Sequence, residues 1–253
     1  MRMAIACVFL LVTTIPSIAA TGPLLATYSI RWAGIEVARL GVDVHLGQHD
    51  YRARWDGATT GLVGTLFPFV ASGEVEGRIE GVELSPEHYR GRSTWGDGGS
   101  IWRVEFDPDG RASEIEIERD DLGPRDPVPA PLRVGPDPVT LALTALARAE
   151  PGTRIEGRSF DGRRVLGYDF ACDDPPMVQA GETTLTCLVS AELVAGGTQR
   201  WRESRRGDAE PIRVWLRAEP GSARYLPVRA ETVSRFGTVT AELVAIERPP
   251  RSG

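Results

Sequence analysis

Apolar and polar residues alternate along most of the chain. Tyr28, Ile30 and Trp32 are separated by polar neighbours, which is the two-residue period of a half-buried strand. The same period returns in further segments: 40–46, 51–55, 75–79, 89–95, 102–106, 115–117, 154–170, 185–194, 199–203, 212–217, 225–233 and 239–246. Asp107-Pro-Asp-Gly110 is a strong turn signal between two of them. The sequence therefore predicts an all-β protein, mainly antiparallel.

Segment 137–150 departs from this period and predicts one helix. Asp137 suits the N-cap and Pro138 the first helical position, and Pro151-Gly152 ends the run. A narrow polar stripe is formed by Thr140, Thr144 and Arg148. The rest is apolar, so we expect a curved sheet, as an open barrel or β-spiral, to wrap around this central helix. If strands cover the helix, the function lies on the surface, whereas an open flank would take a lipid.

The segment Gly57–Val70 has two interpretations. Glycines at 57, 61 and 64 precede the apolar run 65–70, which contains Pro68. No Gly-Lys-Ser/Thr follows, so the glycines are not those of a phosphate loop. The run is either a buried strand with an edge marked by proline or a hydrophobic lip at a cavity mouth.

The N-terminus predicts export. Arg2, an apolar run over 4–12 and small residues at 17–20 make residues 1–20 a signal peptide, so we expect a periplasmic protein. No other apolar run in the sequence is long enough to cross a bilayer. Residues 21–248 then form one β-rich domain, although the Pro- and Asp-rich loop 120–136 is a candidate boundary, and 249–253 form a flexible tail.

Export also favours a disulfide between Cys172 and Cys187. Pairing of 185–189 with 165–170 would bring the two residues together. CxxC spacing and neighbouring histidines are absent from the sequence around them, so we expect neither a redox nor a metal role.

The charged and polar residues suggest no catalytic site. The net charge of −6 argues against nucleic-acid binding. His45 and His49 have Asp43 and Asp50 beside them, but they fall on a strand and in a turn, so we assign no metal ligands and no cofactor. His88 has no evident partner, and no Gly-x-Ser-x-Gly motif is present, so we assign no catalytic residues.

Two further groups of side chains have alternative interpretations. Carboxylates alternate with apolar residues at Glu74, Glu76, Glu114, Glu116 and Glu118, which indicates the solvent face of a sheet more than a glycosidase pair. A possible ligand or partner patch is formed by Arg200, Trp201, Arg202, Arg205 and Arg206. These arginines either meet lipid phosphates, lipopolysaccharide or an anionic glycan, or balance nearby acidic residues at a hairpin end.

Three parts of the sequence resemble a family of exported bacterial envelope proteins known as a domain of unknown function. They are 160–164 with 168–170, Trp215 with 225–231 and 236–239, and the helix start 137–141. The chain is also similar to β-spiral envelope-integrity proteins. The resemblance implies a periplasmic, sheet-rich, non-enzymatic protein and supplies no catalytic residues.

Together these observations predict a non-catalytic periplasmic protein that binds a lipid, a glycan or an envelope protein and supports envelope integrity. The alternative is a periplasmic hydrolase of cell-wall or lipid material, which would depend on its histidines.

Overall fold

The structure is a computed structural model that describes residues 21–121, 123–179, 182–198, 210–219, 225–234 and 237–248. These residues contain fourteen strands in one sheet. The strands are β1 (Thr21–Trp32), β2 (Ile35–Leu46), β3 (Asp50–Thr59), β4 (Phe69–Glu80), β5 (Glu83–Trp95), β6 (Gly98–Phe106), β7 (Ala112–Asp120), β8 (Arg154–Phe160), β9 (Val165–Cys172), β10 (Met177–Gln179), β11 (Glu182–Ala195), β12 (Ile212–Ala218), β13 (Tyr225–Ser234) and β14 (Gly237–Glu247). The described helices are α1 (Gly61–Leu66), α2 (Pro138–Ala147) and a 3₁₀ turn (Ala130–Leu132).

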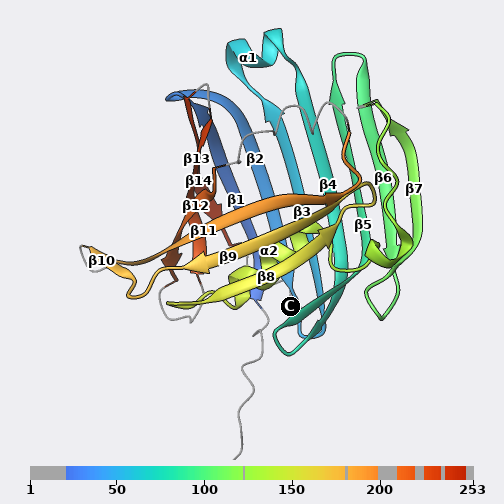
Figure 1. The fold of residues 1–253 in the computed structure, drawn as a ribbon. Helices are drawn as coiled ribbons and strands as arrows, with labels where there is room; N and C mark the ends of the chain where they lie inside the picture. The colour runs from blue at the N-terminus through green and yellow to red at the C-terminus, as the bar shows by residue number, and fades with distance from the viewer. Residues whose placement is uncertain are drawn as a thin grey trace, which may run out of the picture.

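The sheet is antiparallel throughout and does not close. Its order is β7-β6-β5-β4-β3-β2-β1-β14-β13-β12-β11-β9-β8, with β10 attached to β11. From β1 the chain moves outward to one edge at β7, and α2 then leads to the other edge at β8 (Figure 1). From β8 the strands return to β14, which pairs with β1. The predicted antiparallel all-β class is therefore confirmed, and strands on both sides of the loop 120–136 belong to one sheet.

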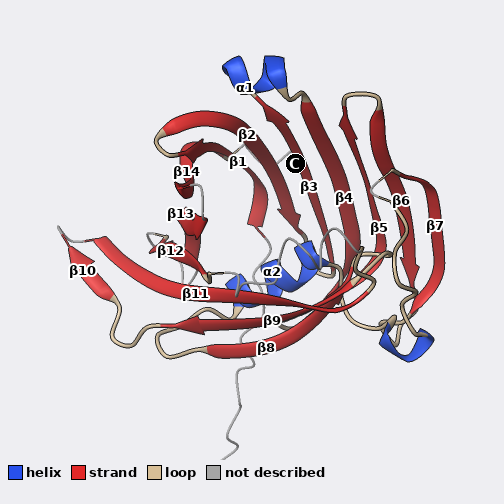
Figure 2. Ribbon diagram, turned by 45° about the horizontal axis from the view of Figure 1, so that its top comes forward, coloured by secondary structure: helices blue, strands red, loops and turns tan. Residues whose placement is uncertain are grey.

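Helix α2 packs between two groups of strands. Figures 1 and 2 show β8, β9 and β11 crossing one end of β3–β5, with α2 between these layers. Helix α2 contacts β5 and β8. Val139 and Leu143 pack against a cluster of buried residues that includes Tyr51, Val75 and Val104. The space between the helix and β3–β6 is thus filled by side chains.

The second half of α2 and the residues just after the helix join another cluster. Ala145 and Ala149 pack with Phe170, Leu185 and Leu216 of β9, β11 and β12. One helix therefore contributes to the cores of both halves of the sheet. Burial of one large apolar side chain stabilises the folded protein by about 1.5–3 kcal/mol. Packing in both clusters therefore favours this arrangement.

The helix begins where the sequence predicts. The carboxylate of Asp137 accepts hydrogen bonds from the backbone N–H groups of Val139 and Thr140, at 2.9 and 3.1 Å. Its burial pattern differs from the expectation. Thr140, in the polar stripe, is fully buried, whereas Ala142 and Ala147 are exposed. The buried hydroxyl is tolerated because it donates to Asp137 and lies beside the Tyr51 hydroxyl.

Two tryptophans lie flat against glycines of the neighbouring strands. Trp55 faces Gly73 in the register of β3 and β4, and Trp102 faces Gly91 in that of β5 and β6. A β-carbon at either glycine would overlap the facing indole ring. Tyr89 lies between the two rings, stacked at 5.8 Å on Trp55. The absence of a side chain at these glycines is what lets the indoles cover the sheet.

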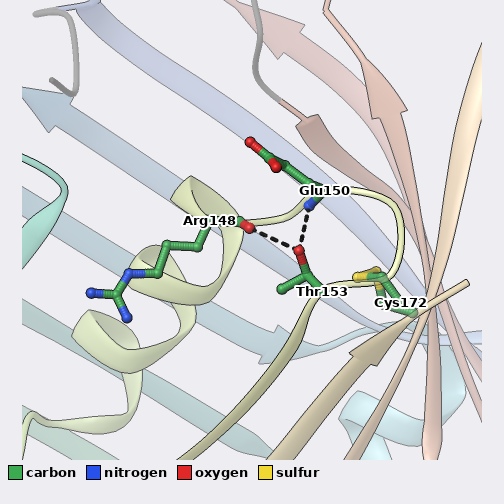
Figure 3. Close-up of a disulfide and its surroundings, with 5 residues drawn as sticks. Arg148, Glu150, Thr153 and Cys172 are labelled. Atoms are coloured by element: carbon green, nitrogen blue, oxygen red, sulfur yellow. Dashed lines mark hydrogen bonds between the residues drawn. A yellow bond between two sulfur atoms is a disulfide. The ribbon is translucent and has the colours of Figure 1, made fainter. Parts of the chain in front are cut away.

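Cys172 and Cys187 face each other across β9 and β11. Their sulfur atoms are 2.08 Å apart, which is a disulfide distance and the pairing that the sequence predicts. Thr153 connects this bridge to the end of α2. Its hydroxyl donates to the Arg148 carbonyl oxygen and accepts from the Glu150 N–H, and its carbonyl accepts from the Cys172 N–H (Figure 3).

Candidate functional site

The connection between β3 and β4 exposes a group of large apolar side chains. We call this group the apolar tip; it consists of Leu62, Leu66, Phe67, Phe69 and Val70. Leu62 is 75% exposed and Phe67 is 72% exposed, and no residue of α1 is buried. The alternative of a buried strand over 65–70 is therefore wrong. The chain forms the short helix α1 at one end of the sheet, and β4 begins only at Phe69 (Figure 1).

Local hydrogen bonds hold this connection in place. The Thr59 hydroxyl accepts from the Phe69 N–H at 2.9 Å and donates to the Phe67 carbonyl at 3.0 Å. Gly61 takes a positive φ of 58°, which reverses the chain at the start of α1. These contacts explain why the glycine-rich segment makes a compact loop instead of extending β3.

The β1–β2 turn lies beside the apolar tip. The Thr60 N–H donates to the Val37 carbonyl at 2.9 Å, and α1 contacts β2. Trp32 and Ile35, which flank this turn, are also exposed. Apolar exposure is therefore shared by two adjacent connections at the same end of the sheet, and contiguous exposure of this kind marks an interaction surface.

A hollow of about 1070 Å³ crosses the polar face of the sheet. Its floor follows residues that pair from strand to strand: Ala26, Val42, Trp55, Gly73, Gly91 and Trp102. Its lining contains as many arginines as carboxylates and no residue of α2. Glu74, for example, accepts from Arg54 at 3.0 Å and from Arg90 at 3.2 Å. Burial opposes ionisation of Glu74, but side-chain hydrogen bonds with Glu76, Arg90 and Arg54 lower its pKa. The hollow therefore has no single-sign field to attract an ion.

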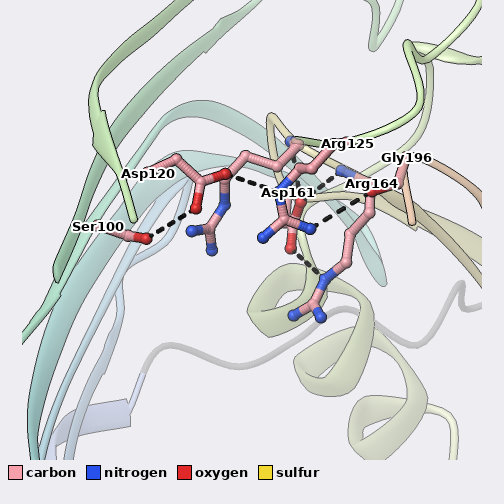
Figure 4. Close-up of polar contacts among 7 residues, drawn as sticks. Ser100, Asp120, Arg125, Asp161, Arg164 and Gly196 are labelled. Carbon is pink, nitrogen blue, oxygen red and sulfur yellow. Dashed lines mark hydrogen bonds and ion pairs between the residues drawn. The ribbon is translucent and has the colours of Figure 1, made fainter. Parts of the chain in front are cut away.

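A second polar cluster joins elements near the two sheet edges. Asp161 is buried and accepts from the backbone N–H and the guanidinium of Arg164, at 2.8 and 2.7 Å. Asp120, the last residue of β7, accepts from Ser100 and from Arg125, which also donates to the Gly196 carbonyl (Figure 4). The Asp161 contacts thus close the β8–β9 turn, and the Arg125 contacts connect β7 with the residue that follows β11.

Arg163 belongs to the same turn. Its guanidinium carbon lies 4.0 Å from the centre of the Trp102 ring, and burial lowers the pKa of Arg163. Cation–π contact with the indole offsets part of the cost of burying the charge. The sequence pattern 160–164 therefore has a structural role at this junction.

Comparison with known families identifies the chain. Residues 27–244 match the family described as Protein of unknown function (DUF3108). The chain belongs to the DUF3108 family. A search of curated proteins gave no match. Among solved structures, it is similar to the beta-barrel-like protein of domain of unknown function DUF1849 from Brucella abortus, with a TM-score of 0.55, 9% identity, and coverage of 91% of this chain and 99% of that one. That similarity concerns the fold.

The histidines of this DUF3108 protein lie on the sheet and its turns. His45 is in β2, and His49 precedes β3, where its carbonyl accepts from the Ile79 N–H. His88 does have a partner, because its Nδ1 contacts the Glu105 carboxylate across β5 and β6. Among the residues that the structure describes, no three His, Cys, Asp or Glu side chains form a group able to hold a metal ion.

Several predictions fall outside the described residues. They concern the signal peptide 1–20, the strand 199–203, the patch Arg200, Trp201, Arg202, Arg205 and Arg206, and the tail 249–253. None of the helices in the described part of the chain has the length and apolarity needed to cross a bilayer. The sequence singled out the segment of the apolar tip but left open whether its apolar run is buried or exposed. Its signal is the absence of charged residues from 57 to 73 in a chain that is 25% charged.

Proposed function

We propose that this DUF3108 protein is a non-catalytic periplasmic protein that binds an apolar component of the bacterial envelope and thereby supports envelope integrity. The apolar tip is the observation that carries the proposal. Large apolar side chains such as Leu62 and Phe67 are exposed together on a connection that has no charge. Exposed contiguous apolar groups in an exported protein are typical of a binding surface.

The packing of α2 supports a surface site. The helix and β3–β6 enclose a filled cluster, so a ligand between them would have to displace core side chains such as Tyr51 and Val104. The paired cysteines Cys172 and Cys187 are compatible with an oxidising compartment outside the cytoplasm.

The proposal can be tested by complementation of a deletion strain. We expect the wild-type gene to restore resistance to detergents and large antibiotics, and the Leu62→Ser/Phe67→Ser variant to fail at equal protein level. Met177→Ser/Val178→Ser is the matched control, because these side chains are also exposed but lie on the distant β10 (Figure 1). Full restoration by the Leu62→Ser/Phe67→Ser variant would overturn the proposal.

The hydrolase alternative has its own test. It requires a histidine, so the triple variant His45→Gln/His49→Gln/His88→Gln would lose the ability to complement if the protein were a hydrolase of that kind. On the proposed function, this variant complements as the wild type does. No observation in the described residues favours the hydrolase over the binding protein.

A further inference from the structure

We infer that the partner of the apolar tip is a lipid bilayer, into which α1 and the start of β4 insert from one end of the sheet. This inference rests on the proposed function and names the chemical class of its partner. The protein would stand on the membrane surface, with the α1 end of β2 and β3 directed toward the lipid. Three independent observations favour a bilayer over a protein partner.

The first observation is shape. The short helix α1 stands at the end of the sheet (Figure 2), and the exposed apolar side chains of the tip belong to this helix, to Phe67 and to the start of β4. The hollow of about 1070 Å³ touches Thr60 but none of the apolar side chains of the tip. Apolar side chains that are exposed in this way need an apolar environment outside the protein to leave water. A bilayer receives it without a preformed pocket, because lipid chains rearrange around an inserted side chain.

The second observation is the distribution of charge. From Gly57 to Gly73 the sequence contains no Asp, Glu, Lys or Arg, and charged residues resume at Glu74. Each buried charge would add a large cost to insertion into hydrocarbon. Protein interfaces, in contrast, use charged pairs to set orientation and to reject wrong partners. The uncharged segment therefore fits a bilayer, into which apolar side chains insert, better than a protein partner, which charged pairs would hold in one orientation.

The third observation is the internal pairing of polar groups. In hydrocarbon, backbone and hydroxyl groups need partners within the protein. The Thr59 hydroxyl pairs with both the N–H of Phe69 and the carbonyl of Phe67. The Thr65 hydroxyl donates to the Gly61 carbonyl at 3.3 Å, and the Phe67 N–H donates to the Val63 carbonyl at 2.7 Å. The hydroxyl groups of Thr59 and Thr65 are thus already paired before any contact with lipid.

The neighbouring turn extends the same surface. Trp32 and Ile35 are exposed beside α1, and tryptophan is enriched where proteins meet the boundary between lipid and water. Arg39, further along β2, is exposed and paired with Glu36 at 2.9 Å. Charged residues therefore resume directly after Ile35, at Glu36, which limits insertion to the tip.

This mode of binding has a defined dependence on lipid and salt. The protein has a net charge of −6, so an anionic surface offers it no overall attraction. Apolar burial drives the insertion instead, and salt does not screen it. We expect the protein to bind vesicles of pure phosphatidylcholine, with an affinity that changes less than about twofold between 50 and 500 mM salt.

Flotation of the purified full-length exported protein with phosphatidylcholine vesicles tests the inference. We expect the Leu62→Ser/Phe67→Ser variant to bind at least about tenfold more weakly, since it removes two apolar side chains from the inserting surface. Met177→Ser/Val178→Ser should bind as the wild type does. All three proteins should share one melting temperature, because the substituted side chains are exposed.

A second measurement reports the position of the tip. In a Leu66→Trp variant, we expect vesicle binding to shift the tryptophan emission to the blue. We also expect this emission to be quenched by lipids that carry bromine near the headgroup end of the acyl chain. Leu188→Trp, on β11, is exposed to a lesser degree and gives no such quenching if the tip alone inserts.

The outcomes separate this inference from the proposed function. No binding of the wild type to vesicles, together with loss of complementation by Leu62→Ser/Phe67→Ser, overturns the bilayer and indicates a protein partner. Equal vesicle binding by the wild type and that variant also overturns it. Binding that needs anionic lipid and disappears in salt overturns the apolar mechanism. Failure of the proposed function itself would appear as complementation by the tip variant.

Discussion

The hydroxyl oxygen of Tyr51 on β3 lies 2.5 Å from the hydroxyl oxygen of Thr140 on α2. Thr140 gives its own proton to the Asp137 carboxylate, so Tyr51 is the donor in this pair. The chain Tyr51–Thr140–Asp137 links the sheet to the N-cap of the helix through buried groups. Burial and the nearby Asp137 raise the pKa of Tyr51, which keeps its proton in place for this role.

Replacement of Thr140 by valine should destabilise the protein. Valine keeps the shape but removes the acceptor of Tyr51 and a donor to Asp137, which leaves buried polar groups unsatisfied and costs about 1–3 kcal/mol. Urea unfolding measures the loss. Thr144→Val is the control, since the Thr144 hydroxyl donates to a backbone carbonyl and is only partly buried. Equal free energies of unfolding for Thr140→Val and the wild type would contradict the role of this link.

Replacement of Asp137 by asparagine should have an effect that depends on pH. Burial raises the pKa of Asp137 in the folded protein, so the folded state holds the proton to higher pH than the unfolded chain does. The contribution of this group to stability is therefore full below the ordinary carboxyl pKa and is lost as pH rises through the folded value. Asparagine caps helices equally well and carries no charge.

We thus expect the free energy of unfolding of Asp137→Asn, relative to the wild type, to improve as pH rises from acidic to neutral. Unfolding curves at several pH values measure this difference. Asp137→Ala controls for the cap itself and should cost about 0.5–2 kcal/mol where the carboxylate is ionised. A difference between Asp137→Asn and the wild type that is constant with pH would mean that the carboxyl does not titrate differently on folding.

An alanine at Gly91 should strain the sheet. Its β-carbon would lie 2.8 Å from Cε2 of Trp102 and closer still to the neighbouring ring atom, so the indole has to move. Overpacking of this kind costs about 1–3 kcal/mol. Gly57→Ala is the control, because its closest contact would be 3.4 Å. Adding Trp102→Phe to Gly91→Ala should recover part of the loss relative to Trp102→Phe alone; additive effects of the two changes would argue against ring overlap.

Removal of the disulfide should lower the melting temperature without abolishing the fold in the cold. Cys172 and Cys187 are separated by 15 positions, and closing a loop of that size contributes about 3 kcal/mol in the chain-entropy model. Thermal melts of Cys172→Ser/Cys187→Ser, and of the wild type with and without reductant, measure the effect. The double variant should not respond to reductant. Identical wild-type melts in both conditions would show that the bridge is absent in solution.

Periodicity predicted the sheet well because each strand alternates between a core side and a polar side. The two cysteine-bearing strands do pair, as expected, but in another register: 165–170 lies opposite 189–195, and this register places Cys187 opposite Cys172. The start of α2 was equally accessible, because Asp137 and Pro138 act through local geometry. These features depend on neighbours in the sequence or on one strand partner.

The apolar tip could not be placed in the same way. Hydrophobicity shows that Leu66 and Phe67 gain by leaving water, but it does not show whether this chain supplies a partner for them. The glycines favoured turns without fixing which turn, and the pairing of Thr59 with Phe69 depends on a specific hairpin geometry. The burial of Thr140 likewise depends on Tyr51, far away in sequence, and no local pattern contains that information.

The pairing of β1 with β14 sets the order in which this protein can mature. Leu25 pairs with Glu247 and Trp32 with Val239, so one side of β1 remains open until β14 arrives. A chain that emerges from its N-terminus cannot complete the middle of this sheet until its last strand is available. Such long-range closure is slow, and an open strand edge is prone to wrong pairing meanwhile. The newly made chain therefore has a period in which protection of β1 decides between folding and aggregation.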